Sequence, residues 1–220
     1  MVTQTSGSRR SGDGRSAGLN KASCVESWLY ISGAWAVKPR RLQELGITCV
    51  VNATVELPIL SMEGIEFIPV RVSDKSSADL RPFFHCVADK LEEVRLKNGK
   101  VLVHCVSGVS RSASLILAYL IKYSSLSLRQ AFNHLRKCRS VVRPNNGFFA
   151  QLIEFEKEIR GTSSVQIVSV TDNGLYIPDV FEEEMKILCN QQWRDVILER
   201  PNFQNQFRQV PIPCVWRKRQ

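Results

Sequence analysis

The chain has 220 residues, of which 44% are hydrophobic and 23% are charged, and its formal net charge is +9. This composition excludes disordered and fibrous proteins, and the length fits one domain with terminal extensions better than two small domains. Most of the excess positive charge lies in residues 1–21 and 190–220, so the sequence does not support a basic nucleic-acid groove on the folded body.

The first part of the chain predicts two strands and a helix behind a disordered start. Residues 1–24 are rich in Gly, Ser and Arg, which is typical of a disordered basic segment. Residues 28–31 are expected to form the first strand. Residues 39–45 begin with Pro and are followed by Gly, which is the pattern of a short helix. The unbroken apolar, β-branched run at residues 47–51 predicts a fully buried strand.

The middle of the chain predicts the elements that surround the domain centre. Residues 67–72 are expected to form a strand near a sheet edge, because a proline within it cannot donate a ladder hydrogen bond. A helix is expected from Pro82 until the Asn-Gly pair at residues 98–99 ends it. Residues 101–104 predict a short buried strand. The helix expected at residues 111–123 is apolar on nearly all sides, which indicates a central position.

The last third of the chain predicts two more helices and an extension. A capping box at residues 127–130 begins one helix, and an Asn-Asn-Gly stretch at residues 145–147 precedes another. Strands that alternate with helices indicate an α/β domain over residues 25–160. Residues 161–189 are expected to add a short strand and a helix that pack on this domain. Residues 190–220 contain three prolines and no apolar period, so a disordered basic tail is expected.

The most informative stretch holds a cysteine and, six positions later, an arginine. Cys105 follows a predicted buried strand, and Arg111 begins the predicted central helix. Backbone N–H groups that curl at a helix N-terminus can surround an anion, and Gly108 permits a close approach. Such surroundings favour the thiolate that attacks phosphorus, and a guanidinium can hold two phosphoryl oxygens. The residues expected to bind phosphate together with Arg111 are Val106, Ser107, Gly108, Val109 and Ser110.

The His-Cys-x5-Arg-Ser pattern at residues 104–112 resembles the motif of the protein tyrosine phosphatase superfamily, and residues 108–113 resemble its dual-specificity branch. Three further stretches resemble the small atypical group that contains dual specificity phosphatases 14, 18 and 21, namely residues 52–54, 143–148 and 177–180. The resemblance covers residues 25–188. It implies a central, mostly parallel twisted sheet flanked by helices, with the phosphate-binding loop between a central strand and a helix.

Expulsion of the alcohol from a phosphate ester requires a general acid. Asp74 lies in the loop after the strand predicted at residues 67–72, where the resemblance places this acid. Asp79 is the rival, but it lies closer to the helix that begins at Pro82 and can simply stabilise the N-terminus of that helix. We therefore assign the general acid to Asp74.

The resemblance also assigns supporting roles. Ser112 would donate a hydrogen bond to the thiolate, although helix capping is its alternative role. His104 would order the loop as a buried histidine, and Asn145 would brace the phosphate loop, although an N-cap role fits its spacing equally well. Cys86 could form a redox pair with Cys105, but its helical setting favours packing.

These features predict a protein phosphatase that hydrolyses phosphotyrosine, phosphoserine and phosphothreonine esters through a phosphocysteine, without a metal or other cofactor. Two alternatives stay open, a catalytically weak phosphoprotein-binding scaffold and a lipid or RNA phosphatase of the same superfamily. The uncharged loop between Cys105 and Arg111 disfavours substrates with additional phosphates. The expected partners are phosphoproteins, with mitogen-activated protein kinases implied only by analogy, and nucleic acid is not expected. The oligomeric state is not determined.

The cysteines indicate the redox compartment. The seven cysteines are odd in number and show no CxxC spacing, which disfavours a disulfide framework and a zinc site. We therefore expect reduced thiols and a cytoplasmic or nuclear location. The Arg- and Ser-rich start leaves a mitochondrial location open. No apolar run is long enough to span a membrane.

Overall fold

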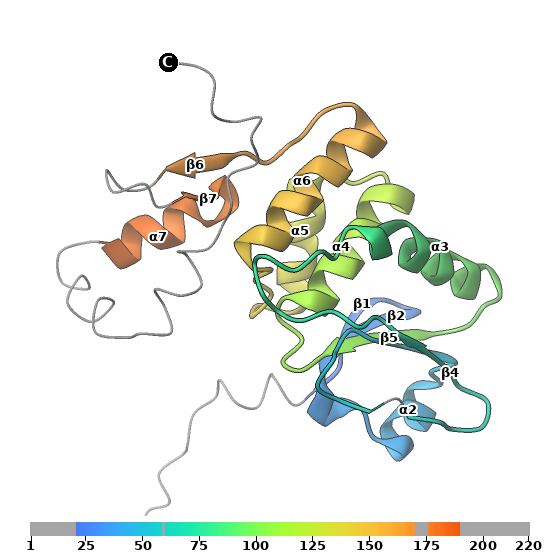
Figure 1. Ribbon diagram of the computed structural model, residues 1–220. Helices are drawn as coiled ribbons and strands as arrows, with labels where there is room; N and C mark the ends of the chain where they lie inside the picture. Colours follow the sequence, from blue (N-terminus) through green and yellow to red (C-terminus); the bar gives the residue numbers. More distant parts are fainter. Residues whose placement is uncertain (1–20, 59, 170–175, 190–220) are drawn as a thin grey trace, which may run out of the picture.

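The computed structural model describes residues 21–58, 60–169 and 176–189, and a five-stranded sheet forms its centre (Figure 1). The strands are β1 (Ser23–Glu26), β2 (Leu29–Gly33), β3 (Cys49–Asn52), β4 (Glu66–Pro69) and β5 (Val101–Cys105). Their order is β1-β2-β5-β3-β4. Only the β1–β2 pair in this sheet is antiparallel. The mostly parallel sheet and the edge position of β4 are therefore confirmed.

Two strands differ from the prediction. The unpredicted strand β1 begins at Ser23, inside the segment 1–24 that was expected to be disordered, and residues 1–20 of that segment lie outside the described residues. Long-range contacts hold the start of this strand in place, because Arg139 donates to the carbonyl oxygen of Lys21 and to Ser23 Oγ. The strand predicted at residues 67–72 ends at Pro69.

Helices cover both faces of the sheet (Figure 1). They are α2 (Pro39–Leu45), α3 (Pro82–Leu96), α4 (Arg111–Tyr123), α5 (Leu128–Cys138) and α6 (Asn146–Arg160). α3 to α6 lie on one face, where Val101 and Val103 of β5 join the larger core, while Leu102 points to the other face and packs in the cluster with Leu42 of α2. Every residue of α4 from Arg111 to Ile121 is buried, which confirms its central position.

The predicted start and stop signals lie at the ends of the helices. Gly46 follows α2 with a left-handed φ of 68°. Ser127 and Gln130 form both bonds of the capping box at the start of α5. Asn145 caps α6 by accepting a hydrogen bond from the backbone N–H of Phe148. These local signals set the residues at which the helices begin and end.

The C-terminal extension packs on α5 and α6. It comprises β6 (Ile167–Ser169), β7 (Tyr176–Pro178), the 3-10 helix η2 (Asp179–Phe181) and α7 (Glu182–Cys189). The ring of Phe181 lies edge-on to Phe132 and Phe149, with centroids 5.3 Å apart in each pair. The carboxylate of Glu184 pairs with Arg136 and Arg143. The tail predicted at residues 190–220 lies outside the described residues.

Candidate active site

The thiol of Cys105 lies at the end of β5, where the chain enters a loop that leads into α4. The side chain is fully buried. Its Sγ accepts hydrogen bonds from the backbone N–H of Gly108 at 3.2 Å and from Ser112 Oγ at 3.3 Å. Two donors directed at one sulfur stabilise negative charge on it. The sequence-predicted neighbours Gly108 and Ser112 therefore contact the expected nucleophile directly.

The backbone of this loop turns its carbonyl groups outward. The carbonyl oxygens of residues 106–110 accept hydrogen bonds from Ala34 N, the Arg139 guanidinium (residues 107 and 108), Arg143 N and Ser114 N, at 2.9–3.0 Å. In a trans peptide the C=O and N–H groups point in opposite directions, and the described residues contain no cis peptide bond. The N–H groups of residues 107–111 therefore point toward the interior of the loop, where they can surround a tetrahedral anion.

Gly108 is needed for a reason that differs from the expected one. Its φ is +69°, and a Cβ built on it would lie 2.5 Å from the carbonyl oxygen of Ser32. The close approach that requires glycine is therefore between the loop and the end of β2. Side-chain clearance for the anion is not the observed constraint.

Arg139 braces the loop from behind and was missed by sequence reasoning. It follows α5 and is only 3% exposed. Its Nε donates to the carbonyl oxygen of Gly108 at 2.9 Å, and Nη2 donates to that of Ser107 at 3.0 Å. Burial lowers the pKa of this guanidinium, and the nearby Cys105 offsets only part of that shift. The only local signal was a charged residue after a helix, and nothing in its neighbourhood points to a partner 31 residues away.

Arg111 is held on one side and leaves a donor unpaired on the other. Its Nη1 donates to Glu56 Oε2 at 2.7 Å and to the carbonyl oxygen of Val72 at 3.2 Å. Its Nε is buried and has no hydrogen-bond partner among the described residues; the closest carboxylate oxygen, Asp74 Oδ2, lies 3.6 Å away. A buried unpaired donor is costly, so this guanidinium fits an anion. Sequence reasoning also missed Glu56, whose pKa the hydrogen bond from Arg111 lowers.

Asp74 lies against the loop, whereas Asp79 does not. Asp74 Oδ1 accepts hydrogen bonds from Ser110 Oγ at 2.7 Å and from Asn145 Nδ2 at 2.9 Å. The Asp74 side chain is 30% exposed, so it remains accessible to a ligand. Asp79 is exposed and accepts a hydrogen bond from the backbone N–H of Arg81, just before α3. The fold therefore brings the preferred carboxylate to the loop and leaves its rival at the start of a helix.

The two supporting residues have clear structural contacts. His104 is 4% exposed, and its Nδ1 donates to the carbonyl oxygen of Cys105 at 3.3 Å. Burial lowers the pKa of His104, which favours a neutral ring. Asn145 caps α6 and also binds Asp74, while its backbone N–H donates to Ser110 Oγ at 3.1 Å. Both roles considered for Asn145 are thus compatible with one position.

Comparison with known proteins decides the family. The sequence-family model described as "Dual specificity phosphatase, catalytic domain" matches residues 29–158 of this chain. The chain belongs to the dual-specificity phosphatase family. It is 43% identical over 170 residues to dual specificity protein phosphatase 14 of Mus musculus, covering 77% of this chain and 79% of that protein. It is 40% identical over 173 residues to dual specificity protein phosphatase 18 of Bos taurus, covering 78% of this chain and 91% of that protein.

A solved structure of this phosphatase family has the same fold. A mouse putative dual specificity phosphatase complexed with zinc tungstate matches with a TM-score of 0.62 and 29% identity, covering 71% of this chain and 96% of that one. The expected group and α/β fold are confirmed. Membership in the dual-specificity phosphatase family supports a protein phosphatase function.

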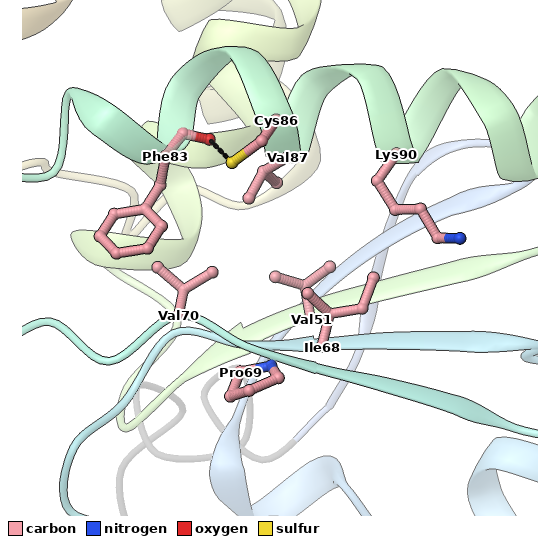
Figure 2. A pocket seen from close by; sticks show the side chains of 8 residues that line it. All are labelled: Val51, Ile68, Pro69, Val70, Phe83, Cys86, Val87 and Lys90. Atoms are coloured by element: carbon pink, nitrogen blue, oxygen red, sulfur yellow. Dashed lines mark hydrogen bonds between the residues drawn. The ribbon is translucent and has the colours of Figure 1, made fainter.

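This dual-specificity phosphatase also has an apolar cavity of about 230 Å³ between β4 and α3, and no residue of the phosphate loop lines it (Figure 2). Cys86 borders the cavity and is exposed, so it does not have the buried position that packing would give. It lies one position before Val87, off the buried stripe of α3. The Cys86 thiol donates to the carbonyl oxygen of Phe83, and Lys90 pairs with Glu66. Both polar groups at the cavity are therefore already engaged.

No group of three or more His, Cys, Asp or Glu side chains suited to a metal ion occurs among the described residues. Within those residues, no helix has the length and apolar character needed to cross a bilayer. Metal independence of the reaction stays a prediction.

Proposed function

We propose that this chain hydrolyses phosphotyrosine, phosphoserine and phosphothreonine esters in proteins through a phosphocysteine on Cys105, without a metal. One observation carries the proposal: the loop turns its carbonyl groups outward, so its N–H groups, the thiol and the unpaired Nε of Arg111 can meet at one tetrahedral anion. The mouse relative complexed with zinc tungstate supports an oxyanion ligand, since tungstate is tetrahedral like phosphate.

The first step forms the sulfur–phosphorus bond. The Cys105 thiolate attacks phosphorus while the bond from phosphorus to the substrate oxygen breaks. The backbone N–H groups and Arg111 balance the charge on the phosphoryl oxygens. Asp74 gives its proton to the departing oxygen, which leaves as an alcohol or a phenol. The product of this step is phosphocysteine and the dephosphorylated protein.

The second step restores the enzyme. Asp74, now a carboxylate, takes a proton from a water molecule as that water attacks the phosphorus of phosphocysteine. The sulfur–phosphorus bond breaks and the sulfur leaves as a thiolate, which the Ser112 hydroxyl at 3.3 Å stabilises. Inorganic phosphate is released. No oxidant, reductant or cofactor enters this balance.

Rapid-mixing kinetics with p-nitrophenyl phosphate, in the presence of a metal chelator, tests this function. The native protein should release one equivalent of p-nitrophenol per Cys105 in a burst and then turn over. Cys105→Ser should abolish both phases. In a parallel assay with phenyl phosphate, whose leaving group is poorer than p-nitrophenol, Asp74→Asn should lower kcat by about 10²–10⁴, while the matched control Asp79→Asn stays within about twofold. Turnover by purified Cys105→Ser, or loss of activity in the chelator, would contradict the mechanism.

A further inference from the structure

Three exposed apolar side chains lie at the carboxyl edge of the sheet: Val106 belongs to the phosphate loop, and Trp35 and Val55 lie on segments next to it. Gly33 of β2 pairs in register with Cys105, and Asn52 of β3 pairs with His104. Trp35 and Val55 follow shortly after these positions on their own chain segments, and Val106 directly follows Cys105. Because β2, β3 and β5 are parallel, the segments that follow them emerge at one edge, which is where ligands bind in open α/β sheets.

Hydrogen bonds fasten the segments that carry these side chains to the loop. The backbone N–H of Ala34 donates to the carbonyl oxygen of Val106 at 2.9 Å, one residue before Trp35. On the β3 side, Glu56 accepts from Arg111 at 2.7 Å, one residue after Val55. The segment after β2 and the segment after β3 are therefore both hydrogen-bonded to the loop or to the arginine that follows it.

These three side chains are apolar and exposed to solvent. Trp35 is 74% exposed, Val55 42% and Val106 40%. Single apolar residues on a surface need no explanation, but several at the mouth of one site mark a place where ligand is bound. Glu56, the charged neighbour of Val55, is already engaged by Arg111. Trp35, Val55 and Val106 therefore offer apolar surface to a ligand at the mouth, beside the Glu56 carboxylate that Arg111 pairs with.

We propose that Trp35, Val55 and Val106 select phosphoprotein segments that carry a large apolar residue, aromatic or aliphatic, next to the phosphorylated residue. This inference rests on the proposed function, because the phosphate of the same segment occupies the loop. The flanking apolar side chain loses its contact with water against Trp35 and Val106. A tryptophan anchor is well suited to such recognition, since it buries a large area with few rotatable bonds.

The test compares two phosphotyrosine peptides that differ only in the residues beside the phosphotyrosine, which are leucine in one and serine in the other. The full chain should show a kcat/KM about tenfold higher for the leucine peptide, with the difference in KM. Trp35→Ala should reduce this ratio to about two, and Trp35→Phe should restore most of it. Leu96→Ala, which alters another exposed residue (67% exposed) on α3, is the matched control and should keep the full ratio.

The outcomes separate this inference from the function on which it rests. The same preparation is assayed with p-nitrophenyl phosphate, which has no flanking residues. If that ester is hydrolysed but the two peptides react equally, the inference is wrong and the phosphatase function stands. If Trp35→Ala keeps the tenfold ratio, and Val55→Ser keeps it too, the inference is equally wrong. If neither the ester nor the peptides are hydrolysed, the proposed function fails and the inference fails with it.

Discussion

At the level of single residues, the guanidinium of Arg111 is oriented by groups that belong to the protein. Nη1 is occupied by Glu56 and by the carbonyl oxygen of Val72, while the buried Nε has no hydrogen-bond partner among the described residues and can donate to a ligand. Orientation before binding removes part of the entropic cost of reaching the transition state. Glu56 is 47% exposed, so its ion pair contributes little to folding stability. We infer that its value lies in positioning Arg111.

Replacement of Glu56 tests this positioning role. Glu56→Ala should lower kcat/KM for p-nitrophenyl phosphate by about tenfold, because Arg111 loses one of its two acceptors. Glu56→Gln keeps an acceptor oxygen and should recover most of the activity. Unfolding free energies should change by no more than about 1 kcal/mol. Equal activity in Glu56→Ala and the native protein would contradict the role.

The Glu56 contact also has a defined pH window. Arg111 lowers the pKa of Glu56 below the ordinary value of 4.5. A lowered pKa means that the folded state favours the carboxylate. The contact is therefore complete above pH 4.5 and is lost only as the pH falls through the lowered pKa.

At the level of elements, the phosphate loop is shaped by what holds its outer side. The Arg139 guanidinium donates hydrogen bonds to the carbonyl oxygens of Ser107 and Gly108, and the backbone N–H of Arg143 donates to that of Val109. These bonds fix the peptide planes, and the planes fix the directions of the N–H groups. A donor ring built this way costs no reorganisation when an anion arrives.

Substitution of Arg139 should therefore weaken anion binding and also destabilise the fold. Arg139→Met fills a similar volume but leaves the carbonyl oxygens of Ser107 and Gly108 without donors. We expect kcat/KM to fall about a hundredfold and inhibition by inorganic phosphate to weaken in parallel. The unfolding free energy should fall by about 1–3 kcal/mol for each carbonyl left unsatisfied. Unchanged phosphate inhibition in a folded variant would show that Arg139 does not position the loop.

At the level of the whole molecule, the extension after α6 is part of the folded body. Phe181 is fully enclosed with Phe132 and Phe149, and Glu184 joins Arg136 of α5 to Arg143. The backbone N–H of Arg143 in turn bonds the loop carbonyl of Val109. The extension therefore adds both core area and a connection toward the active site.

Loss of the Phe181 ring should destabilise the entire domain. Phe181→Ala should lower the free energy of unfolding by about 3–5 kcal/mol, as expected for a buried aromatic side chain. Tyr176→Ala, at a residue 43% exposed in the same extension, is the control and should change it by less than about 1 kcal/mol. The measurement is denaturant unfolding followed by circular dichroism. A global transition unaffected by Phe181→Ala would mean that the extension unfolds independently.

The sequence by itself determined the features that neighbouring residues encode together. The Cys105–Arg111 spacing, Gly46 after α2 and the capping box of Ser127 with Gln130 all lie within a few residues of their partners. Backbone preferences and hydrogen bonds over such short separations depend little on the rest of the fold. The spacing of apolar residues along the sequence was likewise enough to predict the α/β class and the central position of α4.

The tertiary structure alone decided which distant groups meet at the loop. Glu56 reaches Arg111 across 55 positions, Arg139 reaches Gly108 across 31, and the steric need for glycine at 108 arises from Ser32 on another strand. β1 and the exposed position of Cys86 were missed for the same reason. Such contacts depend on strand register and on helix packing. The position of a residue in the sequence does not tell which distant residue will lie next to it after folding.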